Sequence, residues 1–173
     1  ESSSDYYVIT NHGTLTINGG MITSQSSHSS AIENGWYTPS QNTSGQYCNL
    51  TISAGTVSSP NATGVLYTLK NDDYGIMEIN GGTFSNSTAG AGTVLNWNDL
   101  TVNGGTFNAN GNAAVRTCAE GSAGNPAHAY EIGSTVITNG EFTGAIDTLS
   151  GYNRAITISI TGGTFSSDVS AYV

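Results

Sequence analysis

The sequence predicts an all-β chain that folds as a parallel β-solenoid of about six coils, with three short strands in each coil. Two observations carry this prediction. A short motif recurs six times along the 173 residues, and in every copy apolar and polar residues alternate on both sides of a glycine turn. A single coil cannot bury its own apolar face, so the coils must stack to form a continuous core. Residues 1–173 are therefore expected to form one β-solenoid domain.

The six motif copies predict the first two strands of each coil. The copies are residues 15–22, 50–57, 77–84, 100–107, 135–142 and 158–165. Alternation along a strand predicts one inward column before the turn, made of Ile17, Ile52, Ile79, Val102, Ile137 and Ile160. It predicts a second inward column after the turn, made of Ile22, Val57, Phe84, Phe107, Phe142 and Phe165. The four phenylalanines are expected to form an internal aromatic ladder.

A weaker third column completes each coil. Its predicted inward residues are Ile32, Leu66, Val94, Val115 and Ile146. The competing fold is a β-sandwich built from regular hairpins. A sandwich would explain the strands but not the near-identical columns, so the pattern favours the solenoid.

The same register separates the two cysteines. Cys48 lies just before the first strand of the second copy, and Cys118 follows the third strand of the fourth. Neighbouring strands are about 4.8 Å apart, so the two residues should lie about 10–14 Å apart along the axis. A disulfide needs Cα atoms within about 7 Å. We therefore expect two buried thiols, although an extracellular chain would ordinarily favour a disulfide.

The composition excludes two classes of partner. The chain has 3 Lys and Arg against 12 Asp and Glu, a net charge of -9, whereas nucleic-acid binding needs clustered cations. No run of about 18 apolar residues is present, so we expect no membrane insertion. Its polar residues are mainly Ser, Thr, Asn and Gly, which is common in secreted β-rich proteins and predicts an extracellular location.

The repeated motif resembles a known class of bacterial protein. Repeats of the form Ile-Asn-Gly-Gly-Thr-Phe, as at residues 79–84, and the closing segment 161–173 resemble β-helix regions of large adhesin-like surface proteins. Those proteins belong to Gram-positive, often gut-dwelling, bacteria. The resemblance covers nearly the whole chain and implies a right-handed, pectate-lyase-like β-helix. It also implies a larger parent protein that is secreted or held on the cell surface, and it brings no catalytic residues.

The alternative function is a carbohydrate-active β-helix enzyme, of the polysaccharide lyase or glycoside hydrolase type. Lyases need cations that neutralise a uronate, and this chain has few. Hydrolases need two carboxylates at a set separation. The only adjacent acidic pair is Asp72-Asp73, which we interpret as part of a solvated turn, with a bound calcium ion left open. We therefore assign no catalytic residues, no cofactor and no metal site.

Two other functions are disfavoured by spacing. His12, His28 and His128 lie in separate coils, so they are interpreted as turn residues rather than zinc ligands. An outward column of threonines follows the glycine turn, but Met21 and Glu141 interrupt it. This interruption disfavours an ice-binding face.

The predicted binding site lies at the corner after the third strand, where insertions collect. The longest inserted loops span residues 35–49 and 119–133, and loops on a rigid scaffold commonly carry binding groups. The outward third-strand positions, predicted as Glu33, Tyr67, Leu95, Arg116 and Asp147, are chemically mixed. The candidate ligand-binding residues are Trp36, Tyr37, Tyr67, Trp97, Arg116 and Asp147.

Aromatic rings beside amides, carboxylates and an arginine suit a sugar or peptide ligand. The alternative is that these positions simply vary and that both tryptophans pack the loops onto the scaffold. The sequence thus predicts a non-enzymatic, adhesin-like or spacer module that binds a glycan or a host surface protein at this corner. It does not determine an oligomeric state.

Overall fold

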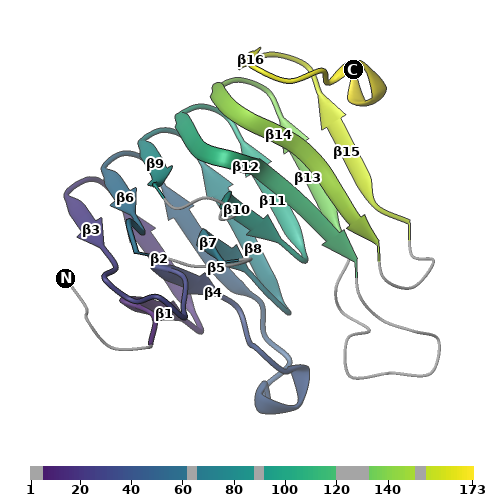
Figure 1. Ribbon diagram of the computed structural model, residues 1–173. Coiled ribbons are helices and arrows are strands. Elements are labelled where there is room, and N and C mark those ends of the chain that lie inside the picture. The colour runs from purple at the N-terminus through teal and green to yellow at the C-terminus, as the bar shows by residue number, and fades with distance from the viewer. Residues whose placement is uncertain (1–5, 62–65, 88–91, 120–132, 151–154) are drawn as a thin grey trace.

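The computed structural model describes residues 6–61, 66–87, 92–119, 133–150 and 155–173. Within these ranges the chain is a parallel β-helix, which confirms the predicted fold class (Figure 1). All pairs of named strands are parallel. In the same ranges, no helix is both long enough and apolar enough to cross a bilayer.

The described strands form two sheets. One sheet contains β2 (Thr14–Ile17), β5 (Cys48–Ile52), β8 (Gly75–Ile79), β11 (Asp99–Val102), β13 (Ser134–Ile137) and β15 (Thr157–Ile160). The other contains β1 (Ile9–Asn11), β3 (Met21–Thr23), β4 (Ile32–Asn34), β6 (Thr56–Ser58), β7 (Tyr67–Asn71), β9 (Thr83–Asn86), β10 (Gly92–Asn96), β12 (Thr106–Ala119), β14 (Glu141–Ser150) and β16 (Thr164–Phe165). Among the described residues, two short 3₁₀ helices, η1 (Pro39–Gln41) and η3 (Ser170–Tyr172), lie outside the sheets.

The first predicted column stacks as expected. The sheet order β2-β5-β8-β11-β13-β15 follows the motif copies along the chain. Each apolar residue before the turn pairs with its counterpart in the next strand. All six of these residues are buried. The alternation in the sequence therefore assigns the inner face correctly.

The phenylalanine ladder is also confirmed. Neighbouring ring centroids from Phe84 through Phe107 and Phe142 to Phe165 are 4.9, 4.8 and 4.9 Å apart, with nearly parallel planes. This spacing matches the distance between neighbouring strands. Each ring therefore packs on the equivalent ring of the next coil.

The glycine turn is required by this close stacking. Gly105 has a φ of 111°, which side-chain-bearing residues rarely adopt. A Cβ atom there would also lie 3.1 Å from the carbonyl oxygen of Gly82 in the preceding coil. Both the backbone conformation and the neighbouring coil therefore select glycine at this corner.

The third column is correct except in one coil. Leu69, not Leu66, pairs with Ile32 and Val94 and is fully buried. Leu66 is only half-buried and precedes the strand. The sequence offers two apolar residues three positions apart, and the later one, Leu69, is the inward residue. Consequently Lys70, and not Tyr67, occupies the outward position beside Glu33.

A buried asparagine ladder runs along the end of the third strands, and the sequence analysis missed it. Asn11, Asn34, Asn71 and Asn96 are in register. Each side-chain amide donates to the carboxamide oxygen of the next, at 2.7, 2.8 and 2.8 Å. The amide of Asn96 donates to Thr135 Oγ1, which is also hydrogen-bonded to Thr117. This ladder is a polar counterpart to the phenylalanine ladder.

The ladder fastens the third strand of each coil to the first strand of the next. Asn71 Nδ2 also donates to the carbonyl oxygens of Gly75 and Asp99, at 3.1 and 2.9 Å. Asn34 Nδ2 likewise reaches the carbonyl oxygens of Cys48 and Ile76. The ladder therefore satisfies main-chain acceptors at the corner where the inserted loops leave the scaffold.

The cysteines lie as the register predicts. Cys48 begins β5 and Cys118 is near the end of β12, in different sheets. Both are buried, and no disulfide joins them. Burial raises the pKa of the Cys48 thiol, and a hydrogen bond from the Trp36 side chain opposes that rise.

Replacing Phe107 with alanine should lower the free energy of unfolding by about 3–5 kcal/mol, because the change empties the middle of the aromatic ladder. The control is Thr106→Ala on the outward face, which should cost less than about 1 kcal/mol. Denaturant titrations of both variants measure the difference. Equal losses would contradict the assigned faces.

The asparagine ladder gives a second stability test. Asn71→Ala should lower the free energy of unfolding by about 3 kcal/mol, because it leaves several buried donors and acceptors without partners. Asn80 accepts a similar amide hydrogen bond from Asn103 on the exposed surface. Asn80→Ala should therefore change stability by less than about 0.5 kcal/mol. If both variants melt alike, the ladder does not stabilise the fold.

Candidate functional site

The corner after the third strand carries a long loop, as predicted. Residues 35–47 connect β4 to β5, whereas residues 72–74 are enough to connect β7 to β8 and residues 97–98 to connect β10 to β11. The other long loop predicted at this corner, which includes His128, lies largely outside the described residues. A site at this corner must therefore be judged from the β4–β5 loop and the neighbouring strands.

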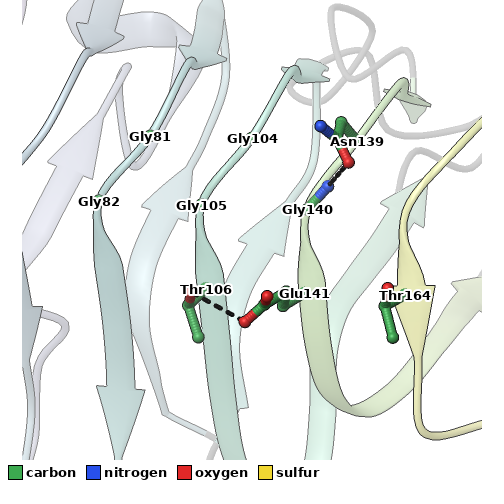
Figure 2. A pocket seen from close by; sticks show the side chains of 9 residues that line it. All are labelled: Gly81, Gly82, Gly104, Gly105, Thr106, Asn139, Gly140, Glu141 and Thr164. Atoms are coloured by element: carbon green, nitrogen blue, oxygen red, sulfur yellow. Dashed lines mark hydrogen bonds between the residues drawn. The ribbon is translucent and has the colours of Figure 1, made fainter.

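One hollow lies along the glycine turns, which join the first and second strands of the coils, and not at the corner after the third strand. It measures about 410 Å³. Its lining residues are Gly81, Gly82, Gly104, Gly105, Thr106, Asn139, Gly140, Glu141 and Thr164 (Figure 2). The Thr106 hydroxyl donates to Glu141 at 3.5 Å, and the other side-chain contact drawn there is local to Asn139 and Gly140. Most of this lining is backbone, so it offers a ligand few groups for recognition.

A second hollow, the tyrosine recess, lies over the third strands at the N-terminal half of the molecule. It measures about 240 Å³. Its lining residues are Tyr7, His28, Ser29, Ser30, Tyr37, Leu66, Tyr67, Lys70 and Leu95. Segments distant in sequence meet here: the chain before β1, the β3–β4 connection, the β4–β5 loop, β7 and β10. The recess combines aromatic rings with an amine, an imidazole and hydroxyls, so it is the stronger candidate site.

Lys70 is held in place within the recess. Its ammonium group forms an ion pair with Asp72 and lies 4.8 Å from the centre of the Tyr37 ring. The side chains of Lys70 and Asp72 are 15% and 5% exposed. Tyr37 is 65% exposed, so much of this residue at the edge of the recess is open to solvent.

Glu33 lies beside the recess and is buried at 4% exposure. Its neighbour in the next strand is Lys70, and the Tyr7 hydroxyl donates a hydrogen bond to its carboxylate. Its Oε1 atom has no hydrogen-bond partner among the described residues. Burial raises the pKa of Glu33 from 4.5 to about 6; Lys70 opposes this rise and Asp72 adds to it. Burial and the nearby Glu33 also raise the pKa of Tyr7.

Two of the predicted ligand-binding residues, Tyr37 and Tyr67, line the recess. Tyr67 is nearly fully buried and its hydroxyl has no partner among the described residues. Burial raises the pKa of that hydroxyl to about 12. Gly92 is the residue opposite Tyr67, and a Cβ atom there would collide with the ring. Tyr67 therefore forms part of the wall rather than an outward contact, which corrects its predicted position.

The two tryptophans do not line the recess. Trp36 stacks on His12 with ring centroids 3.7 Å apart, and its main-chain N–H donates to Asp73. Together with its hydrogen bond to Cys48, these contacts pack the β4–β5 loop onto the scaffold. Trp97 is half-buried, and its main-chain N–H donates to Asn71.

Arg116 and Asp147 form a separate pair farther along the axis. Arg116 donates from Nε and Nη2 to the two Asp147 oxygens, at 2.7 and 2.6 Å. These hydrogen bonds raise the pKa of the guanidinium, and burial opposes the rise. Arg116 follows Lys70 and Leu95 in register, so it lies about 10 Å from Lys70 along the stack. Arg116 and Asp147 thus lie on the predicted outward face of the third strands, but neither lines the recess.

The interpretation of Asp72-Asp73 as a solvated turn is wrong. Both side chains are buried, as is Asn71. The loop after β4 covers the turn through a bridge between Trp36 and Asp73. No group of three or more His, Cys, Asp or Glu within the described ranges is placed to hold a metal ion.

The sequence does not bring together Tyr7 and Lys70, which line the recess, and Glu33, which lies beside it. A shift of the third column by three residues in the second coil would have aligned Lys70 with Glu33. Tyr7 gives no such signal, because it precedes the first strand. No protein-family model matches the chain, and neither does any curated protein or solved structure.

Glu33 predicts a pH dependence of stability. Its pKa is higher in the folded state, so unfolding between about pH 4.5 and 6 releases a proton. The contribution of Glu33 to the free energy of unfolding should therefore fall as the pH rises through this window. Glu33→Gln should remove this fall and should be more stable than the parent at pH 7.5. Urea titrations from pH 4 to 8 measure both, and an unchanged pH slope in the variant would contradict the assignment.

Proposed function

We propose that this chain is a non-enzymatic module of a bacterial surface or secreted protein and that it binds glycan at the tyrosine recess. The observation that carries the proposal is the exposed Tyr37 ring beside the recess, held by the Lys70 ammonium group. Sugar rings stack on exposed aromatic faces while their hydroxyls bond to polar groups nearby. Ser29, Ser30 and His28 supply such groups around the recess.

The size and charge of the site narrow the type of glycan. At about 240 Å³, the recess is smaller than the roughly 300–1,000 Å³ of sites for drug-sized ligands. It suits a single sugar residue, with the rest of a chain lying over the outer surface. The net charge of -9 disfavours polyanionic glycans such as polyuronates.

The surface location rests on sequence resemblance and composition. The Ile-Asn-Gly-Gly-Thr-Phe repeats are similar to those of adhesin-like proteins of Gram-positive bacteria, and the polar residues are mostly uncharged. A stack of coils whose strands pair only with their neighbours also forms a stiff rod. The module could thus hold a binding site at a set distance from its attachment point, which suits both the adhesin and the spacer roles.

Glycoside hydrolysis is the second candidate function. Glu33 has a pKa of about 6 and interacts with the nearby Asp72, and hydrolases use two carboxylates whose pKa values differ. However, Glu33 is almost fully buried, Tyr7 donates to it, and Lys70 pairs with Asp72. A substrate oxygen would have to displace these contacts, so binding is the better-supported function. Release of reducing ends from a bound glycan, abolished in Glu33→Gln, would instead establish hydrolysis.

Tyr37→Ala should weaken glycan binding by about tenfold, because an aromatic stacking contact contributes about 0.5–1.5 kcal/mol beyond its buried area. The matched control is Tyr47→Ala. Tyr47 is 52% exposed on the same loop but contacts Tyr74 and does not line the recess. A glycan array followed by calorimetry with the best ligand measures both variants.

Tyr47→Ala should bind like the parent protein, and neither change should shift the melting temperature by more than a few degrees. Equal glycan affinities for the parent and Tyr37→Ala would show that the glycan does not bind at the recess. If the glycan array identifies no ligand, the spacer role is the only one of the two proposed roles that remains.

A further inference from the structure

The first coil is the end of both sheets. β2 is the last strand of one sheet, and β1 and β3 are the two end strands of the other. Each of the three pairs with one strand only: β1 with β4, β2 with β5 and β3 with β6. Among the described residues, no strand lies on their other side. The N-terminal end of the stack, here called the N-terminal edge, therefore presents three strand edges together (Figure 1).

The hydrogen bonds on the paired side of β2 show which main-chain groups face the open side. The carbonyl oxygens of Gly13 and Ile17 accept hydrogen bonds from the next coil, at 2.7 and 2.8 Å. Main-chain groups of successive residues in a strand point to opposite sides. The N–H and C=O groups of Thr14 and Thr16 therefore face away from the stack. Such a row of groups is a template for another β-strand.

The N-terminal edge lacks the charges that commonly keep edge strands from associating. Residues 6–31 contain no Asp, Glu, Lys or Arg, although the whole chain has a net charge of -9. Met21 in β3 is 80% exposed, and Ile9, Leu15 and Ile22 are only partly buried against the core. Two copies of this acidic chain can therefore meet at the N-terminal edge without opposing carboxylates from these residues.

The glycine turn of the first coil leaves room for another main chain. A Cβ atom at Gly55, Gly82 or Gly105 would lie 3.0, 3.0 or 3.1 Å from a carbonyl oxygen of the preceding coil. At Gly19 and Gly20 a Cβ atom would meet nothing within 4 Å. The absence of side chains at this turn therefore allows close approach of a second backbone.

The C-terminal end of the stack differs from the N-terminal edge. η3 contacts β15, and Val169 and Tyr172 pack against the core beside it. The same segment carries the exposed carboxylate of Asp168. The chain thus covers this end with its own last residues, which disfavours a head-to-tail arrangement of copies, the type that builds open filaments.

We propose that the N-terminal edge binds a second copy of this chain, with the two copies arranged head to head about a two-fold axis. This arrangement reverses the chain direction, so the strands that meet are antiparallel. An axis through β2 pairs it with β2 of the other copy and pairs β1 with β3. The strand lengths match, with four residues in β2 and three in both β1 and β3. Both copies use the same surface, so the assembly closes at two chains. The inference goes beyond glycan binding and does not depend on it.

Sedimentation equilibrium of the parent protein and three variants tests the inference. Thr16 and Ser159 are exposed and occupy the same outward column, in the first and last strands of one sheet. Thr16→Glu adds a carboxylate at the N-terminal edge, and Ser159→Glu adds the same charge at the far end as the matched control. Thr16→Pro removes an N–H group on the open side of β2 without adding charge. Circular dichroism confirms that each variant is folded.

We expect the parent to form a dimer at pH 7 within the range of about 1 μM to 1 mM. Thr16→Glu brings two carboxylates together near the axis, so it should weaken dimerisation at least about tenfold. Thr16→Pro should also weaken it, and Ser159→Glu should dimerise like the parent.

Three outcomes would overturn the inference. The first is a parent that stays monomeric over the whole concentration range. The second is a dimer that both Thr16 variants leave unchanged, or that Ser159→Glu weakens as much as Thr16→Glu does. The third is a series of masses above two chains, which would indicate head-to-tail association instead.

Discussion

The whole structure depends on hydrogen bonding between neighbouring coils at a single repeat distance. Because each coil lies about 4.8 Å from the next, a residue type that recurs at the same position must tolerate a copy of its own kind as its neighbour. Phenylalanine does so by stacking, with centroids 4.8–4.9 Å apart. Asparagine does so by donating with one end of its carboxamide and accepting with the other. Glycine at the turn does so by leaving the space that the preceding carbonyl needs.

The candidate site lies where this repetition stops. Along the outward third-strand column the residues are Glu33, Lys70, Leu95, Arg116 and Asp147 in register. No two neighbours there are alike, so each pair forms a different contact. Opposite charges meet at Arg116 and Asp147, whereas one carboxylate oxygen of Glu33 has no donor in the part of the chain that the structure describes. The repeated inward columns thus support an outward surface whose residues can differ from coil to coil. The proposed binding site is formed by these differing residues.

Much of the fold could be predicted from sequence because its signal is repeated. Six copies of one motif place Ile52 or Phe107 on the inner face with little ambiguity. The third column is weaker, and there the sequence offered both Leu66 and Leu69. Choosing Leu66 hid the alignment of Asn71 with Asn34 and Asn96, and with it the ladder. An asparagine recurs two residues after the inward apolar residue in four coils, and this pattern identifies both Leu69 as the inward residue and the asparagine ladder.

The recess was less predictable, since its members come from separate segments and share no motif. The sequence identifies Tyr37 from its loop, but Tyr7 precedes the first strand and His28 lies in the β3–β4 connection. The recess exists only when the chain before β1, the β4–β5 loop and strands β7 and β10 are docked together. In a solenoid, terminal coils can detach while the rest remains folded. The strands that carry the phenylalanine ladder, β9, β12, β14 and β16, lie toward the C-terminal end of the stack (Figure 1). A load that peeled β1 away would therefore remove Tyr7 and dismantle the recess while the C-terminal coils still held. The proposed ligand, by binding across these coils, would resist that peeling.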